Sequence, residues 1–205
     1  MKLLFISGPS GSGKTTLSNQ ILARIKNGIV LRTDNYYKTG IISKLISIFV
    51  KGYFDRSISF DCKLFKKDFN FIVQNGISIN ERSYNFKDKT KINFSNKINN
   101  IKFLIVEGIF AREFSSTIYR QKIFLLELKI NKNECMNRVL QRDLKERGKA
   151  KKKALTDFLR SWDIYYKNFK NKSIKRNINE IIIKKNTSID KIIKNYLTES
   201  FKLNR

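Results

Sequence analysis

Short apolar segments recur along the chain, each bounded by polar or turn residues. They span Lys2–Ser7, Gly28–Thr33, Lys102–Glu107, Lys122–Lys129 and Glu180–Lys184. Uninterrupted apolar runs of this length are typical of strands buried on both faces, as in a parallel sheet covered by helices. The pattern therefore predicts the strands of a parallel core sheet.

Apolar residues at helical spacing follow the first, fourth and fifth of these segments. The stripes are Leu17, Ile21, Leu22 and Ile25; Met136, Val139, Leu140 and Leu144; and Ile189, Ile192, Ile193 and Leu197. Asn131, with Glu134 three residues later, predicts an N-cap for the second of these helices. Because strands and helices alternate, we expect residues 1–205 to form one α/β domain with a doubly wound parallel sheet.

Residues 77–95 break this rhythm. Ile77–Asn80 and Lys91–Phe94 alternate apolar and polar side chains, which is typical of hairpin strands with one solvated face. We therefore expect a small β-hairpin lobe inserted between the second and third core strands.

The composition excludes several kinds of chemistry, because the chain contains no histidine. Ser-His-Asp and Cys-His catalysis and the helical His-Glu-x-x-His metal site are ruled out. The two cysteines, Cys62 and Cys135, are too few for a zinc cluster or a disulfide framework. Proton transfer must therefore use carboxylates, Lys, Tyr or Cys, and we expect a reducing, cytoplasmic location.

No targeting or membrane-spanning segment is expected. The apolar run Leu3–Ile6 meets Gly8 and Pro9 too early for a signal peptide. The stretch Ile41–Val50 is interrupted by Lys44 and is far shorter than a membrane span.

The net charge of +26 is large for 205 residues. A basic balance of this size is typical of proteins that bind nucleic acid or an anionic membrane surface. The excess is spread along both halves of the chain, so we interpret it mainly as a composition bias that favours polyanionic ligands such as nucleotides. A nucleic-acid-binding NTPase stays an alternative, but no nucleic-acid motif supports it.

A phosphate-binding loop follows the first apolar segment. Residues 8–16 satisfy the pattern G-x-x-x-x-G-K-[ST]. In such a loop the backbone N–H groups turn toward phosphate oxygens, and the positive end of the following helix adds to the attraction. Lys14 is expected to reach the β- and γ-phosphates of a nucleotide, and Thr15 to bind Mg²⁺. The predicted ATP-binding residues are Gly8, Pro9, Ser10, Gly11, Ser12, Gly13, Lys14, Thr15 and Thr16.

Two carboxylates stand at the ends of buried segments. Asp34 comes directly after Gly28–Thr33, and Glu107 ends Lys102–Glu107. Ligands of open α/β sheets bind at the carboxyl ends of the strands, and P-loop proteins place a Mg²⁺-site carboxylate there. We therefore expect Asp34 and Glu107 to join Thr15 at a metal site.

Several sequence blocks stand in a recognisable order around these residues. They are residues 8–16, Asp34–Tyr37, Phe54–Asp61, Tyr84–Phe86, Glu107–Ile109 and Arg142–Lys149. Together they resemble the uridine kinases and their phosphoribulokinase-like relatives over nearly the whole chain. The resemblance implies a P-loop kinase fold and transfer of the γ-phosphoryl group of ATP, with Mg²⁺, to the 5′-hydroxyl of a pyrimidine nucleoside.

The same resemblance assigns roles to residues. Asp34 would accept the proton of the acceptor hydroxyl, while Lys14 and the lid arginines Arg142 and Arg147 would neutralise the transferring charge. The lid would cover about residues 142–153. The implied substrate-binding residues are Asp55, Tyr37, Tyr84, Phe86 and Lys89.

For some of these residues a purely structural role stays open as the alternative. Arg142 and Arg147 could pair with Glu146 and Asp143 on a solvated helix face. Tyr84 and Phe86 could simply pack the small lobe, and Asp55 could be an ordinary loop acid.

Departures from the family pattern gather on the acceptor side. Lys89 stands where the family has a histidine, Asn85 where it has an aspartate, and Val139 where it has an arginine, with Arg138 adjacent. A kinase for another small hydroxyl substrate, of the sugar phosphate, nicotinamide riboside or pantothenate type, is therefore the alternative. We expect ATP and a small-molecule acceptor as partners, with no nucleic acid and no membrane, and a homo-oligomer is allowed.

Overall fold

The computed structural model describes residues 1–86, 88–118, 121–170, 177–184 and 187–194. The strands are β1 (Lys2–Ser7), β2 (Gly28–Arg32), β3 (Ser78–Asn85), β4 (Thr90–Ile98), β5 (Phe103–Glu107), β6 (Ile123–Leu128) and β7 (Ile178–Ile183). The α-helices are α1 (Lys14–Leu22), α2 (Ile41–Phe49), α3 (Cys62–Asn75), α4 (Ala111–Ser115), α5 (Lys132–Lys145) and α6 (Lys151–Tyr165). Short 3₁₀ turns cover Thr33–Tyr36, Tyr53–Asp55 and Ser57–Ser59, and a π turn covers Tyr166–Lys170.

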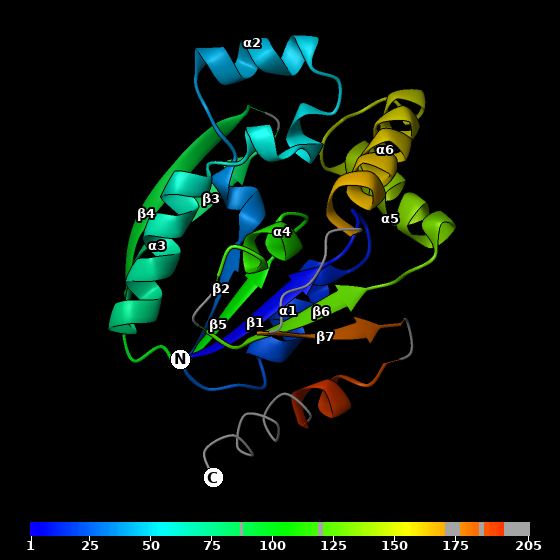
Figure 1. The fold of residues 1–205 in the computed structure, drawn as a ribbon. Coiled ribbons are helices and arrows are strands. Elements are labelled where there is room, and N and C mark those ends of the chain that lie inside the picture. The colour runs from blue at the N-terminus through cyan, green and yellow to red at the C-terminus, as the bar shows by residue number, and fades with distance from the viewer. Residues whose placement is uncertain (87, 119–120, 171–176, 185–186, 195–205) are drawn as a thin grey trace.

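The core is a parallel sheet with strand order β2-β5-β1-β6-β7. All the apolar segments that predict core strands lie in it, with their ends displaced by a few residues at most. Helices lie on both sides of the sheet (Figure 1). The predicted doubly wound α/β fold is therefore confirmed.

Alternate residues of β1 serve the two faces of the sheet, as strand geometry requires. Leu3 and Phe5 pack in a core with residues of α3 and α4, and Leu4 and Ile6 pack in a second core with residues of α1 and α5. Ile192, from the last predicted stripe, joins the second core, whereas Leu197 lies outside the described residues. The central strand is thus buried on both sides, which fixes the loop that follows it.

Strands β3 and β4 form the predicted hairpin, an antiparallel pair outside the core sheet. A partly buried ion pair holds it in place, because Arg82 of β3 donates from Nε and Nη2 to the carboxylate of Asp68 on α3, at 2.6 and 3.1 Å. Tyr36 also donates to Asp68, at 2.9 Å, and burial followed by the Asp68 charge raises the pKa of its phenol. The hairpin is therefore fixed beside the segment that begins at Asp34.

The predicted N-cap of α5 is also present. The Asn131 side chain accepts a hydrogen bond from the Asn133 backbone at 2.9 Å. Glu134 pairs instead with Arg138, one turn further along the helix. None of the described helices has both the length and the apolar character to cross a membrane.

Candidate active site

A cavity of about 700 Å³ opens at the carboxyl ends of β1, β2 and β5. Residues far apart in the sequence meet in its wall, and the predicted site residues among them are Ser10, Gly11, Gly13, Lys14, Thr15, Thr16, Asp34, Tyr37, Asp55, Phe86, Lys89, Glu107, Arg142 and Arg147. Of the remaining phosphate-loop residues, Gly8, Pro9 and Ser12 lie outside this lining. Tyr84 also lies outside it and is buried between Tyr37 and Phe86, with ring centroids 5.2 and 5.1 Å away.

The phosphate loop curls between β1 and α1. Gly13, at φ 94°, is the N-cap of α1, so the helix begins at Lys14. Gly11 has φ 79°, and a Cβ there would stand 2.4 Å from the Cys135 carbonyl oxygen, so the loop packs against α5 only with glycine at this position. The Lys14 ammonium donates to the Pro9 carbonyl at 3.0 Å, which holds it across the loop. Burial lowers the pKa of Lys14, while Glu107 and Asp34 oppose that shift.

Thr15 and Glu107, two of the residues predicted to hold Mg²⁺, lie in direct contact. The Thr15 hydroxyl donates to Glu107 Oε1 at 2.9 Å, and Glu107 is 4% exposed. Burial raises the pKa of Glu107, and the nearby Asp34 charge adds to the rise. At Gly108, φ 142°, a Cβ would lie 1.8 Å from Thr33 Oγ1, so glycine allows the ends of β5 and β2 to approach each other.

These oxygen atoms suit Mg²⁺ better than a softer metal. Magnesium takes oxygen ligands and is commonly bound by one or two carboxylates together with substrate phosphates. The described residues contain no group of three or more His, Cys, Asp and Glu side chains that could enclose a metal ion on their own. The Thr15 hydroxyl and the Glu107 carboxylate are oxygen groups of this type, and they lie beside the phosphate loop.

Asp34 lies where the phosphate side of the cavity meets the acceptor side. It belongs to the 3₁₀ turn Thr33–Tyr36, directly after β2. Its charge contributes to the raised pKa values of Glu107 on one side and of Tyr37 and Asp55 on the other, in each case after the larger effect of burial. A single carboxylate therefore acts electrostatically on both halves of the site.

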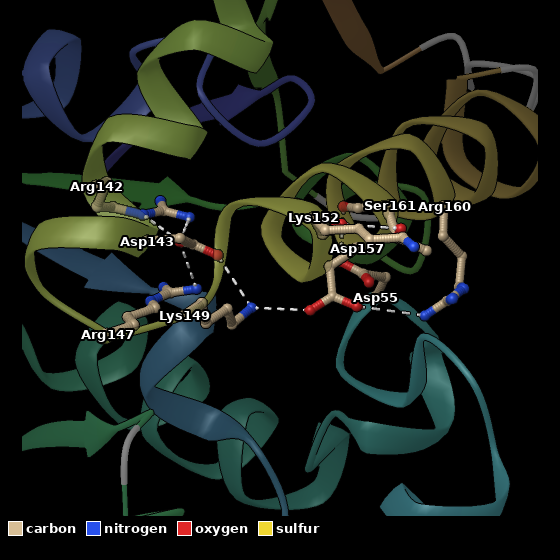
Figure 2. Close-up of polar contacts among 10 residues, drawn as sticks. Asp55, Arg142, Asp143, Arg147, Lys149, Lys152, Asp157, Arg160 and Ser161 are labelled. Atoms are coloured by element: carbon tan, nitrogen blue, oxygen red, sulfur yellow. Dashed lines mark hydrogen bonds and ion pairs between the residues drawn. The ribbon is translucent and has the colours of Figure 1, made fainter.

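Asp55 is held from helix α6. Ser161 donates from its hydroxyl to Asp55 Oδ1 at 2.7 Å, as Figure 2 allows the reader to follow. Burial raises the pKa of Asp55 to about 6, Asp157 and Asp34 add to the rise, and the Ser161 hydrogen bond and Lys149 oppose it. The carboxylate is thus ionised only above mildly acidic pH.

Aromatic rings form one wall of the acceptor side. Tyr37 is surrounded by Phe54, Tyr84 and Phe86, with ring centroids 5.3, 5.2 and 5.6 Å away. Lys89, at the tip of the hairpin with φ 55°, places its ammonium 5.7 Å from the Phe54 ring centroid. A flat apolar ligand would find ring faces here, with a cation at the rim.

The segment after α5 is organised by Asp143, which is 2% exposed. Its carboxylate forms ion pairs with Arg142 at 3.1 Å, Arg147 at 3.3 Å and Lys149 at 3.0 Å. Figure 2 shows how Lys149 continues this network to Asp157 of α6, at 3.1 Å. The Arg147 guanidinium also lies 4.3 Å from the Phe86 ring centroid. Arg147 is therefore directed from the predicted lid into the cavity.

Several residues in the cavity wall were not predicted from the sequence. Arg138 donates to the carbonyl of Gly11 at 3.2 Å and so supplies a guanidinium beside the phosphate loop. The neighbouring residue, Val139, is the one that stands where the family pattern has an arginine. Ser161, Asp157 and Arg160 all come from α6. The signal for that helix is the apolar spacing of Ala154, Phe158 and Ile164, which are buried.

Comparisons with known proteins agree with this geometry. Residues 3–188 match the model of the Phosphoribulokinase / Uridine kinase family. A protein named uridine kinase from Borrelia duttonii is 32% identical over 172 residues, 82% of this chain and 80% of that protein. Another of that name, from Ureaplasma parvum serovar 3, is 29% identical over 187 residues, 88% of this chain and 87% of its own.

Solved structures share the fold at low sequence identity. A D-glycerate 3-kinase from Cryptococcus neoformans superposes with a TM-score of 0.61 at 11% identity, covering 89% of this chain and 86% of its own. A possible uridine kinase from Bacillus stearothermophilus gives a TM-score of 0.54 at 15% identity, covering 82% of this chain and 83% of its own.

Proposed function

Because this chain belongs to the Phosphoribulokinase / Uridine kinase family and is an ATP-dependent kinase, we propose that it phosphorylates the 5′-hydroxyl of uridine or cytidine with the help of Mg²⁺. The observation that carries the proposal is the position of Asp34 between a phosphate loop and an aromatic-walled pocket that contains Asp55. A kinase needs this order: a nucleotide phosphate site, a carboxylate at the point of transfer, and an acceptor pocket beyond it.

On the phosphate side, backbone N–H groups of the loop and the Lys14 ammonium bind the β- and γ-phosphates. Thr15 and Glu107, with Asp34 nearby, would hold Mg²⁺, which neutralises phosphate charge when it is bound. Arg138, Arg142 and Arg147 also line the cavity and add three guanidinium groups to it. These cations stabilise the charge on the equatorial oxygens of the transferring group.

On the acceptor side, Asp34 orients the 5′-hydroxyl and receives its proton. The transition state of phosphoryl transfer is loose, so the nucleophile loses its proton late and a carboxylate can accept it. Asp55 accepts hydrogen bonds from the ribose hydroxyls, while Tyr37 and Phe86 pack against the nucleoside. This division of roles needs no histidine, which the chain does not contain.

A panel of acceptors tests the proposal. Release of ADP is measured by a coupled assay with uridine, cytidine, nicotinamide riboside, pantothenate and ribulose 5-phosphate. We expect uridine and cytidine to accelerate ADP release well above the background without acceptor. The proposal fails if neither nucleoside does so.

A second candidate acceptor class follows from further cations of the cavity wall. Lys51, Lys89, Lys153 and Arg160 all line the cavity, which favours an anionic acceptor such as a sugar phosphate. Acceleration by ribulose 5-phosphate but not by uridine would establish this candidate.

The pKa of Asp55 predicts a pH profile for acceptor binding. Asp55 must be ionised to accept hydrogen bonds from two hydroxyls, and its pKa is raised to about 6. We therefore expect kcat/KM for the nucleoside to fall as pH drops below about 6. Ser161→Ala removes a hydrogen bond that lowers this pKa, so the acidic limb should move to higher pH.

Two variants separate this effect from general damage to α6. Ser161→Thr keeps the hydroxyl and should leave the limb in place. Thr156→Ala removes an exposed hydroxyl from the same helix, which donates to the Lys152 carbonyl, and should change nothing. An unshifted limb in Ser161→Ala would contradict the assignment of Asp55 to the acceptor.

A further inference from the structure

Helix α2 exposes a concentrated apolar surface. The exposed fractions are 78% for Ile41, 75% for Ile42, 51% for Leu45, 71% for Ile48 and 81% for Phe49. These side chains form most of a nine-residue helix. Figure 1 shows α2 at the periphery of the molecule, at the top of the view and away from the core sheet. A contiguous exposed apolar patch marks a surface that interacts with another protein or with a membrane.

The orientation of α2 is the reverse of an ordinary surface helix. Ser43 is buried, donates to the Lys38 carbonyl at 2.8 Å and shares a hydrogen bond with the Tyr53 hydroxyl at 3.0 Å. Ser47 accepts a hydrogen bond from the Lys89 ammonium at 3.0 Å. The helix is therefore attached by its polar side, whereas surface helices normally bury the apolar side. Its apolar face is held outward by specific contacts.

Cations flank this face without any acidic neighbour in sequence. Lys38, Lys44 and Lys51 are exposed, and residues 36–54 contain no Asp or Glu. No ion pair involves these three lysines in the part of the chain that the structure describes. The chain as a whole carries +26. Two copies meeting through α2 would therefore bring like charges together.

We propose that α2 docks the protein on an anionic lipid bilayer surface. The apolar side chains enter the boundary between headgroups and acyl chains, and Lys38 and Lys44 contact the lipid phosphates. A nine-residue helix is only about 14 Å long, so it lies in the plane of the interface and does not cross the membrane. The proposal is independent of which acceptor the kinase uses.

Vesicle flotation with the full chain tests this proposal. Wild type should bind vesicles of phosphatidylglycerol mixed with phosphatidylcholine, and bind pure phosphatidylcholine far less. The charge-neutral double variant Ile42→Ser, Phe49→Ser should reduce binding to the anionic vesicles by about tenfold or more, because the apolar contribution is lost.

The chain offers a matched control on the hairpin. Ile92 and Phe94 of β4 are each 50% exposed, and Ile92→Ser, Phe94→Ser makes the same chemical change away from α2. This control should bind like wild type. As a second readout, Phe49→Trp should show a blue-shifted emission on anionic vesicles, compared with the wild type that contains only Trp162.

Three results would overturn the proposal. Equal binding by wild type and both double variants would mean that the net charge alone attracts the protein. An unshifted Phe49→Trp emission on vesicles that bind the protein would place α2 outside the lipid. A dimer in lipid-free sedimentation that is lost only in the Ile42, Phe49 variant would assign the face to a second copy of the chain.

Discussion

Replacing Asp34 with Asn is expected to lower kcat for the nucleoside by roughly 10²–10⁴-fold. The amide keeps the size of the side chain and can still orient a hydroxyl, but it cannot accept the proton that leaves it. The coupled ADP assay measures kcat, and calorimetric titration of the inactive variant with ATP measures nucleotide binding. We expect ATP affinity to stay close to that of wild type, since the phosphate loop is unchanged.

Asp163→Asn is the matched control for this change. Asp163 lies on α6, is exposed and is absent from the cavity wall. Its substitution should leave kcat unchanged. Activity of Asp34→Asn within a few-fold of wild type would show that another group, Asp55 or the phosphate itself, accepts the proton.

Much of the fold and the phosphate side could be predicted because their signals are local. β1 and β5 are buried on both faces and appear as continuous apolar runs, and the loop after β1 is a contiguous motif. Asp34 and Glu107 follow from the rule that ligands bind at the carboxyl ends of parallel strands. Each of these inferences needs only the residues next to it in the sequence.

The acceptor side depends on contacts between distant segments, which a sequence does not display. The bond between Ser161 and Asp55 joins residues 106 positions apart. Tyr84 lies in the same motif as Phe86, yet packing covers Tyr84 and leaves Phe86 in the cavity wall. The motif shows which residue types occur. Packing against the neighbouring rings determines which of these side chains can contact a ligand.

Helix α2 escaped prediction for a different reason. Its segment is apolar at most positions, and the inward face is marked only by Ser43 and Ser47. Apolar spacing identifies a helix by the face that it buries, so a helix attached through serines gives no such signal. Helix α6 begins with Lys151–Lys153, a charged run that resembles a solvated loop until Ala154 and Phe158 enter the core.

The arrangement around Asp143 supports the proposed action of the lid arginines on the transferring phosphate. Burial and the neighbouring Arg142 lower the pKa of Arg147, while Asp143 and Asp34 oppose the shift. The Arg147 side chain is 23% exposed and is fixed on two sides, by the Asp143 carboxylate and the Phe86 ring. A guanidinium fixed before the reaction stabilises developing charge without first having to be ordered.

Arg147→Gln is therefore expected to lower kcat by about 10²–10³-fold, the range found when a positioned charge donor is removed from a transition state. The glutamine keeps part of the stem and a donor, but it loses the positive charge beside Asp34. Measuring kcat and KM for both ATP and the nucleoside should show the loss mainly in kcat. Lys145→Gln removes the same charge from an exposed position on α5, and its kinetics should match wild type. If the two variants behaved alike, Arg147 would be one more cation on a solvated helix face, and the charge of the transferring group would have to be neutralised by Lys14, Arg138 and Arg142 alone.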